Sequence, residues 1–546
     1  MKSEEHMIPM RDGIRLQTFV YLPEGEGSFP AILARCQYGT EGMESRVQDM
    51  LDEGFAAVLQ NIRGRLGSEG GRTGTISSGE DGYDTIEWII SQPWCNGSVG
   101  TFGGSALARV QTAAAFLAHP AHRTMCPQVL PYGMNSRLGG AYMFSQMAQW
   151  LFLTQSGNEL NPYDQVDWMP HLWKLPVISV LDELKGGAEV YRREITNAQR
   201  VRWGLGDPGP FANLKTANLM VTGWYDHCST GPIDFFMMTQ ENSSEFQKEN
   251  THLVIGPWDH SCTPDVIDEY DFGPDAGLDL VKQEVAFFNC HLKGDTSQPE
   301  LPRVRIFVMG RNVWRDEDLW PLERAQETKF YLHSSGEARS TGEPGMLSME
   351  QPKDEKPDHF TYDPADPVPT IGGANSAPAR VLPMKRGPYD QRPVLDRNDV
   401  LLYLSEPMTE PLEVTGPLQL VLYAASSAAD TDFTGKLMDI APDGDARILT
   451  DGVVRARYRN GIDKPEFLAS GEVVKYEIDL WFTSNEFQPG HRIGLAVSSS
   501  NFPRFNRNLN TGGDNERDSD FQTADQIIFH DKEHPSHLVL PVVRET

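Results

Sequence analysis

A serine, an aspartate and a histidine follow one another along this 546-residue chain in the order that acyl-transfer chemistry on an α/β sheet requires. The serine is Ser105, which follows Gly103 and Gly104 and precedes a helix-like run rich in alanine. Small neighbours are needed where a strand turns sharply into a helix and presents a nucleophile. The pattern departs from Gly-x-Ser-x-Gly at Leu107. Because Gly-Gly-Ser alone is commonly a simple turn, Ser105 needs partners before it indicates catalysis.

The partners of Ser105 follow two predicted strands. Residues 219–223 indicate a buried strand that leads to Asp226, and residues 252–255 lead through Gly-Pro to His260. Functional side chains gather at the carboxyl ends of parallel strands, so we expect these groups to meet. The imidazole would take the serine proton, and the carboxylate would fix its tautomer. Asp259 is a rival acid, but neighbouring side chains usually point apart, and we expect Asp226.

Acyl transfer also needs hydrogen-bond donors toward the developing oxyanion. One is the backbone N–H of Ala106, directly after the serine. The second should come from the loop after an earlier strand, residues 29–34, and this loop has no glycine-rich sequence. Tyr38 in that loop has the reach and the hydroxyl, although without other information an aromatic there is commonly a packed residue.

Eight motifs in order extend the pattern over nearly the whole chain: Ile8-Pro9-Met10-Arg11-Asp12-Gly13, Asn61-Ile62-Arg63-Gly64, Trp94-Cys95-Asn96-Gly97, Gly223-Trp224-Tyr225-Asp226, Gly256-Pro257-Trp258-Asp259-His260, Phe287-Phe288-Asn289-Cys290-His291-Leu292-Lys293-Gly294, Asp430-Thr431-Asp432-Phe433-Thr434 and Ser498-Ser499-Ser500-Asn501-Phe502-Pro503. With them the chain resembles the cocaine esterase and X-Pro dipeptidyl-peptidase group of serine hydrolases, which includes α-amino-acid ester hydrolases and glutaryl acylases. The resemblance implies that Ser105 is the nucleophile, Asp226 the acid and His260 the base. It also implies that Tyr38 and the N–H of Ala106 hold the oxyanion.

Two positions depart from the resembled family at the elbow, where Ala106 and Ala108 replace the usual tyrosine and glycine. Alanine is small enough for close helix packing, so we expect the elbow to form. For substrate binding the candidates are Trp150, Trp224, Cys228, Asn375 and Ser376.

The predicted acyl pocket differs from the one that cocaine esterases use against a benzoyl ring. A phenyl group against Asn375 and Ser376 would leave polar groups poorly paired, so we do not expect cocaine as the substrate. Directly after Asp226 the chain offers His227, Cys228 and Ser229 rather than carboxylates for a substrate ammonium group. This weakens an assignment as an α-amino-acid ester hydrolase or a dipeptidyl-peptidase.

Composition is typical of a soluble enzyme with several domains. The chain has 77 acidic and 48 basic residues, and its net charge of −29 argues against nucleic acid and anionic membranes as partners. The six cysteines form no C-x-x-C pair, so we expect neither zinc nor a disulfide framework, and no metal or organic cofactor. The first residues lack an apolar leader and no apolar run is long enough to span a membrane, so we expect a cytoplasmic protein.

Periodicity divides the chain into an α/β domain, a helical insertion and a β-rich part. Short apolar runs alternate with helical patterns before residue 131, which indicates parallel βαβ units. Later strands, among them 303–308, 400–404 and 418–423, follow one another without helices and indicate a β-sandwich. The predicted domains are an α/β-hydrolase domain at 1–133 and 214–300, a helical cap at 134–213, and a jelly-roll β-sandwich at 301–546.

Details within these domains are also predicted. We expect residues 334–379 to form a long surface loop, because they are rich in Gly, Pro, Ser and charge. In the cap, aromatic residues such as Trp150 and Trp168 could line the substrate pocket, although core packing is more common for aromatics in a helical region. Exposed sheet edges would permit a homodimer.

Together these features predict a serine hydrolase that cleaves an ester or amide bond of a small molecule through an acyl-enzyme. An acyltransferase with the same residues differs only in the nucleophile that reaches the acyl-enzyme. An X-Pro dipeptidyl-peptidase or α-amino-acid ester hydrolase is a further alternative. A binding protein with an inactive hydrolase domain is disfavoured by the complete set of Ser, Asp, His and Tyr.

Overall fold

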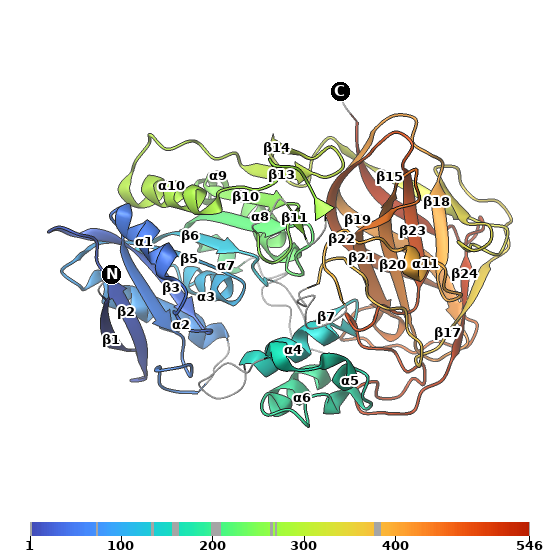
Figure 1. Cartoon of the computed structure of the whole chain (residues 1–546), viewed down its shortest axis with the longest axis horizontal. Helices are drawn as coiled ribbons and strands as arrows, with labels where there is room; N and C mark the ends of the chain where they lie inside the picture. The colour runs from blue at the N-terminus through green and yellow to red at the C-terminus, as the bar shows by residue number, and fades with distance from the viewer. Residues whose placement is uncertain are drawn as a thin grey trace.

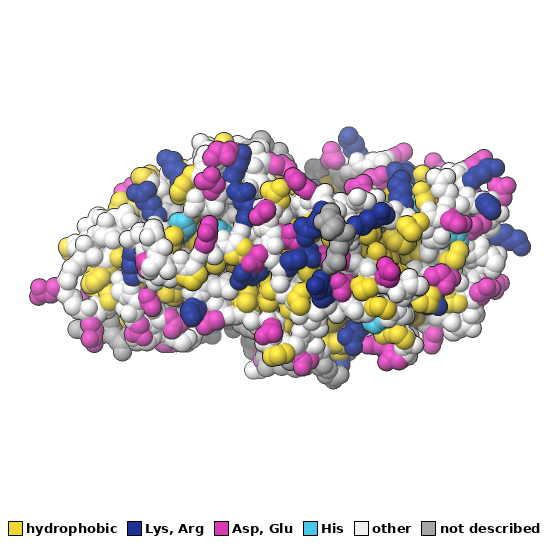
Figure 2. Space-filling model, turned by 90° about the horizontal axis from the view of Figure 1, so that it is seen from above, with side chains coloured by type: hydrophobic (Ala, Val, Ile, Leu, Met, Phe, Trp, Pro, Cys, Tyr) yellow, Lys and Arg dark blue, Asp and Glu magenta, His cyan; other side chains and the backbone are white. Residues whose placement is uncertain are grey.

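A computed structural model describes most of the chain, namely residues 3–71, 75–132, 136–154, 163–197, 209–262, 266–267, 270–375 and 384–544. It has a mixed α/β half, a β-rich half and a group of helices beside the junction of the two (Figure 1). Figure 2 shows acidic side chains spread among basic ones over the visible face rather than gathered in one patch. In the described residues no helix combines the length and apolarity needed to cross a membrane.

A ten-stranded sheet forms the α/β half, in the order β1-β2-β4-β3-β5-β6-β9-β10-β13-β14. The seven strands from β4 to β13 in this order are parallel, as the sequence predicted for its βαβ units, and antiparallel strands flank them. The strands are β1 Ser3–Pro9, β2 Arg15–Tyr21, β3 Phe29–Cys36, β4 Ala56–Asn61, β5 Cys95–Gly104, β6 His122–Gln128, β9 Ala217–Gly223, β10 Thr251–Gly256, β13 Val304–Val308 and β14 Val313–Glu317.

Helices cover both faces of this sheet, which is why its central strands are buried and mostly apolar. Every residue of β4 and of β9 is buried. Helices α1 and α10 pack on one face, and α2, α3 and α8 pack on the other. Their bounds are α1 Glu44–Asp52, α2 Thr75–Ile90, α3 Ala106–Ala115, α8 Thr230–Asn242 and α10 Leu280–Lys293, with the short α9 at Glu245–Glu249.

The group of helices comes from the insertion between β6 and β9. It consists of α4 Phe144–Thr154, α5 Trp168–Leu172, α6 Ala188–Thr196, α7 Gly209–Ala212, the turns η1 Tyr163–Gln165 and η2 Val177–Ser179, and a short hairpin of β7 Arg137–Leu138 and β8 Ala141–Tyr142. Most of it encloses its own core, in which the fully buried Trp168 packs against Phe152 at 5.5 Å between ring centroids. Trp168 is therefore a core residue of the insertion.

The β-rich half is an 11-stranded sheet that is antiparallel apart from the pair β16 and β18. Two-stranded β11 Val266–Ile267 and β12 Tyr270–Asp271 lie outside both large sheets, and α11 Arg392–Leu395 and η3 Ala456–Tyr458 are short helices. The strands of the 11-stranded sheet are β15 Ala325–His333, β16 Gly345–Ser348, β17 Asp358–Tyr362, β18 Leu401–Ser405, β19 Leu412–Ser426, β20 Asp432–Ile440, β21 Ala446–Arg455, β22 Val474–Phe487, β23 Arg492–Ser498, β24 Ala524–Phe529 and β25 His537–Val543.

Two sequence expectations about the β-rich half are wrong. The strand predicted at 303–308 is β13, and it pairs with β10 in the first sheet, so that sheet continues past residue 300. The segment 334–379 is not only a loop, because it contains β16 and β17. In β17 buried and exposed residues alternate, as is typical of a strand. The strand is only five residues long, so the polar composition of the whole segment indicated a loop instead.

One hydrophobic core joins the two halves. It includes Tyr225 and Ile306 from the first half and Phe433 and Leu449 from the second. The Tyr225 hydroxyl donates a hydrogen bond to the carbonyl of Ile448 at 3.2 Å. The loop after β9 is thus held from the β-rich half as well as from its own sheet.

Candidate active site

Ser105 stands in the sharp turn between β5 and α3. Its backbone has φ 57° and ψ −118°, a left-handed conformation that non-glycine residues seldom adopt. The Ser105 N–H donates to the carbonyl of Gln128 at 2.9 Å. Gly103 has φ 126°, and a Cβ placed there would lie 2.7 Å from the Cβ of Leu107. Only glycine fits at this position without displacing the start of α3.

The two alanines of the elbow do not prevent the turn. Ala108 is completely buried where the helix packs closely, so its methyl group fits in the available space. Ala106 is the first residue of α3, and its N–H therefore has no acceptor one turn earlier in the helix. This N–H lies at the positive end of the helix dipole, directly after Ser105.

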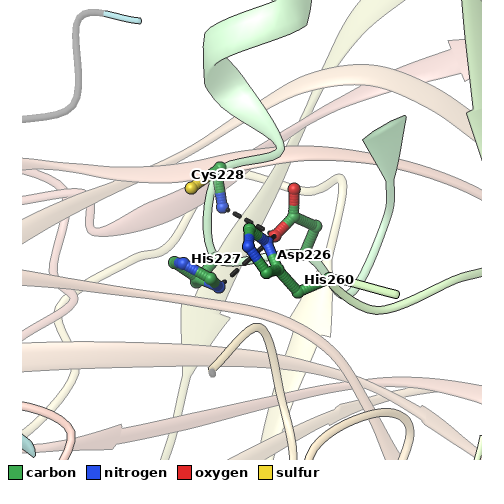
Figure 3. A group of neighbouring side chains, drawn as sticks. All are labelled: Asp226, His227, Cys228 and His260. Carbon is green, nitrogen blue, oxygen red and sulfur yellow. Dashed lines mark hydrogen bonds and ion pairs between the residues drawn. The ribbon is translucent and has the colours of Figure 1, made fainter. Parts of the chain in front are cut away.

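Asp226 and His260 are in direct contact (Figure 3). The Nδ1 of His260 lies 2.7 Å from Oδ1 of Asp226. The same Oδ1 accepts a bond from the N–H of Cys228 at 3.0 Å, and the Thr222 hydroxyl donates to Oδ2 at 3.2 Å. The Asp226 carboxylate is wholly buried, whereas the His260 side chain is 26% exposed.

The loops that carry these two residues hold each other in place. The N–H of Trp224 donates to the carbonyl of Gly256 at 2.9 Å, and that of Tyr225 donates to Trp258 at 3.0 Å. A Cβ on Gly223 would lie 2.1 Å from the carbonyl oxygen of Trp258. The close approach of the two backbones therefore requires glycine and fixes Asp226 against His260.

Electrostatics keep Asp226 ionised. Burial raises the pKa of its carboxyl, but the charge and hydrogen bond of His260, with the Cys228 N–H, outweigh burial and lower the pKa below its ordinary value. A carboxylate that accepts from Nδ1–H fixes the imidazole tautomer with its lone pair on Nε2. His260 is thus equipped to accept a proton at Nε2.

Asp259, the rival acid, points elsewhere. Its Oδ2 pairs with Nε of Arg386 at 2.6 Å, and its Oδ1 accepts bonds from the N–H and the hydroxyl of Ser261 at 2.8 and 2.6 Å. The contact with His260 is made by Asp226.

Tyr38 contacts the helical insertion through its hydroxyl. The half-buried Tyr38 follows β3, and its phenolic oxygen accepts a hydrogen bond from the indole N–H of Trp150 on α4 at 3.1 Å. Of the substrate-binding candidates, Trp150 is therefore tied directly to the candidate oxyanion donor. A phenol that accepts a hydrogen bond becomes a better donor through its own O–H.

The other substrate-binding candidates have different surroundings. Trp224 is buried, donates to the carbonyl of Phe307 at 2.8 Å and packs on Trp320, which are contacts of a core residue. Asn375 is buried and donates to the carbonyls of Gly372 at 3.0 Å and Lys385 at 2.7 Å. Cys228 is buried beside Asp226. Ser376 lies outside the described residues.

Sequence reasoning assigned His227 no role in the site. Its ring lies 4.2 Å from that of His260 between centroids, and its Nδ1 lies 3.3 Å from Oδ1 of Asp226. Burial, together with the positive charges of His260, Arg504 and Arg386, lowers the pKa of His227 to about 3, against the attraction of Asp226. The ring is therefore neutral at physiological pH. The available signal was its position directly after the acid at the end of a strand.

The fold, with a strained serine turn after β5 and the paired Asp226 and His260 after β9 and β10, is that of an α/β-hydrolase. Residues 12–262 match the X-Pro dipeptidyl-peptidase (S15 family), and residues 299–539 match the X-Pro dipeptidyl-peptidase C-terminal non-catalytic domain. The chain is 35% identical to cocaine esterase from Rhodococcus sp. (strain MB1 Bresler) over 577 aligned positions, covering 98% of each protein. It belongs to the cocaine esterase and X-Pro dipeptidyl-peptidase family, as its motifs predicted, and is a serine hydrolase that acts on ester bonds.

Solved structures share the whole fold. An α-amino acid ester hydrolase superposes with a TM-score of 0.85 at 24% identity, covering 99% of this chain and 96% of that one. An aminopeptidase from the marine sediment archaeon Thaumarchaeota archaeon has a TM-score of 0.84 at 24% identity, covering 100% of this chain and 96% of that one. At this identity the likeness shows the fold only.

Proposed function

We propose that Ser105, His260 and Asp226 are the catalytic triad of a carboxylic ester hydrolase, with Tyr38 and the N–H of Ala106 as oxyanion donors. The observation that carries this proposal is the 2.7 Å bond between Asp226 and Nδ1 of His260. It leaves Nε2 as the proton acceptor, while β5 presents Ser105 in a strained turn at the same edge of the sheet.

The steps follow from these positions. Nε2 of His260 takes the proton from Ser105 Oγ as that oxygen attacks the ester carbonyl, and the new oxyanion accepts hydrogen bonds from Tyr38 and Ala106. The imidazolium, stabilised by Asp226, then gives its proton to the leaving alcohol. Water activated by the same imidazole releases the acid from Ser105.

We further propose that the acyl group is not aromatic, although the relative that is 35% identical is a cocaine esterase. Support comes from the polar, buried Asn375 in the segment expected to receive that group, where an unpaired polar atom would oppose a phenyl ring. A substrate ammonium group is disfavoured because the Asp259 carboxylate is already paired with Arg386. Amide cleavage and acyl transfer with the same triad remain predictions.

The experiment is hydrolysis of p-nitrophenyl acetate, butyrate and benzoate by the wild type and by Ser105→Ala. The proposal expects activity that Ser105→Ala abolishes, with the benzoate slowest. Added alcohol or amine acceptors separate hydrolysis from acyl transfer through the products formed. Preferred hydrolysis of the benzoate would contradict the proposed acyl pocket, and activity that survives in Ser105→Ala would contradict the triad.

The domain limits, the location and the oligomer are part of the same proposal. We propose an α/β-hydrolase domain at 1–133 and 214–300, to which β13 and β14 also belong, a cap at 134–213, and a jelly roll in the remainder of 301–546. A cytoplasmic location is supported by the six cysteines, which are all described and form no disulfide. The proposed partner is a small-molecule substrate, without nucleic acid or membrane. The proposed oligomer is a homodimer, and light scattering tests it by measuring the molar mass in solution.

A further inference from the structure

Four neighbouring side chains, among them Asp226 and His260, form a compact group of potential metal ligands. Asp226, His227, Cys228 and His260 each offer one ligand atom, and these atoms lie within 4.8 Å of one another (Figure 3). Asp226, His227 and Cys228 are buried, and His260 is partly exposed, which gives the set one open side. We call these residues the Asp-His-Cys-His group.

His227 has an imidazole that the hydrolytic mechanism does not use. Its side chain is 5% exposed, and among the described residues its Nδ1 has no hydrogen-bond partner, because the contact of 3.3 Å with Asp226 lacks hydrogen-bond alignment. A buried polar atom without a partner carries a free-energy penalty that a bound ligand would remove. An imidazole nitrogen that faces a carboxylate and a second imidazole, with a thiol beside them, has the surroundings of a metal ligand.

We propose that the Asp-His-Cys-His group binds one thiophilic divalent cation of the Zn²⁺ type and that binding reversibly stops hydrolysis. Two imidazoles, a thiolate and a carboxylate are a donor set that Zn²⁺ accepts in tetrahedral geometry. Ligand atoms in such a site are about 3.5 Å apart. The separations of 2.7, 3.3 and at most 4.8 Å bracket this value, so shifts of about 1 Å would close the site.

Binding replaces protons and involves no redox step. The S–H bond of Cys228 breaks, its proton goes to solvent, and a metal–sulfur bond forms. If His260 binds through Nδ1, the hydrogen bond to Asp226 is lost and the ring proton moves to Nε2. If it binds through Nε2, the lone pair that would accept the serine proton is occupied. Either way His260 no longer acts as a base, a consequence that rests on the proposed function.

Binding can be measured without turnover in the Ser105→Ala protein. Titration with Co²⁺ should give one ion per chain and a thiolate-to-cobalt charge-transfer band. Cys228→Ser should abolish the band, and His227→Phe should weaken binding at least about tenfold, with His227→Gln as the second variant if the first does not fold. Cys290 and His291, a half-buried pair on α10, provide a matched control. The variants Cys290→Ser and His291→Phe should leave the charge-transfer band unchanged.

Inhibition is measured next on the active enzyme. Zn²⁺ should inhibit the wild type, EDTA should restore it, and His227→Phe and Cys228→Ser should need at least about tenfold more Zn²⁺, each relative to its own metal-free rate. A cobalt spectrum without a thiolate band, or equal Zn²⁺ sensitivity in all variants, overturns the proposed site. A cobalt band without inhibition overturns only its effect on His260. Failure of a fluorophosphonate to label Ser105 refutes the triad and leaves cobalt binding intact.

Discussion

The hydrogen bond between Trp150 and Tyr38 gives the helical insertion a measurable part in catalysis. Trp150→Phe keeps a smaller aromatic ring on α4 and removes the indole N–H that donates to the Tyr38 oxygen at 3.1 Å. A neutral hydrogen bond of this kind contributes about 0.5–1.5 kcal/mol net. If that energy is expressed in the transition state, kcat should fall about 2- to 12-fold, with little change in KM.

Tyr38→Phe should cost far more, about 10²–10³-fold in kcat, because it removes an oxyanion donor. A double-mutant cycle of Tyr38→Phe and Trp150→Phe measures whether the two residues act together on kcat. In the Tyr38→Phe background, Trp150→Phe should have almost no further effect on kcat, because the atom it supports is gone. The assay is steady-state hydrolysis of p-nitrophenyl acetate by the four proteins.

A matched control is Trp173→Phe, the same substitution in the same insertion, at a tryptophan that is 40% exposed and packs on Phe502. It should leave kcat unchanged. The reasoning is refuted if Trp150→Phe lowers kcat equally with and without Tyr38, or if it raises KM alone, since either result would make Trp150 a substrate contact that acts independently of Tyr38.

Three further predictions follow from the same structure. Asp226→Asn should lower kcat by about 10⁴-fold, as expected when the buried acid of a serine triad no longer fixes the histidine tautomer, and a loss below tenfold in ester hydrolysis would argue against this role. Gly103→Ala places a Cβ 2.7 Å from Leu107 at φ 126°, so it should destabilise the fold by at least about 1 kcal/mol and lower kcat, and an unchanged Tm would contradict the packing of the elbow. Burial lowers the pKa of Lys436 from 10.5 to about 8, so the unfolded chain binds more protons between these values and the fold gains stability as pH rises through them. The free energy of unfolding, measured by denaturant titration of the wild type and of Lys436→Met, gives this effect as the difference between the two proteins. The difference should rise by about 3 kcal/mol in favour of the wild type from pH 7 to pH 10.5. A difference that stays constant with pH would show that folding does not lower the pKa of Lys436.

The parts of the site that lie at strand ends were predictable from sequence. Short buried runs set β9 and β10, glycines marked the turns, and parallel strands had to bring Asp226 and His260 to one edge. The contact between them confirms that geometry, and the choice of Asp226 over Asp259 followed from neighbouring side chains pointing apart.

Contacts set by side-chain orientation were not predictable. His227 contacts His260 because the loops after β9 and β10 approach closely at Gly223. The pattern of apolar residues along the sequence does not predict such a contact between loops. Trp224 was expected near the substrate, yet it lies in the core between the two halves. There it packs against Trp320 and donates a hydrogen bond to the Phe307 carbonyl. The strand β13 had an apolar sequence suited to either sheet, and only its pairing with β10 decided between them.

The most direct test of the account is covalent labelling of the nucleophile. The wild-type enzyme, treated with a fluorophosphonate and digested, should carry one adduct per chain on the peptide that contains Ser105, and its ester hydrolysis should fall in proportion to labelling. Ser105→Ala should take up no label and show no hydrolysis. An enzyme that hydrolyses esters while Ser105 stays unlabelled would contradict the assignment of Ser105, His260 and Asp226 as the catalytic triad.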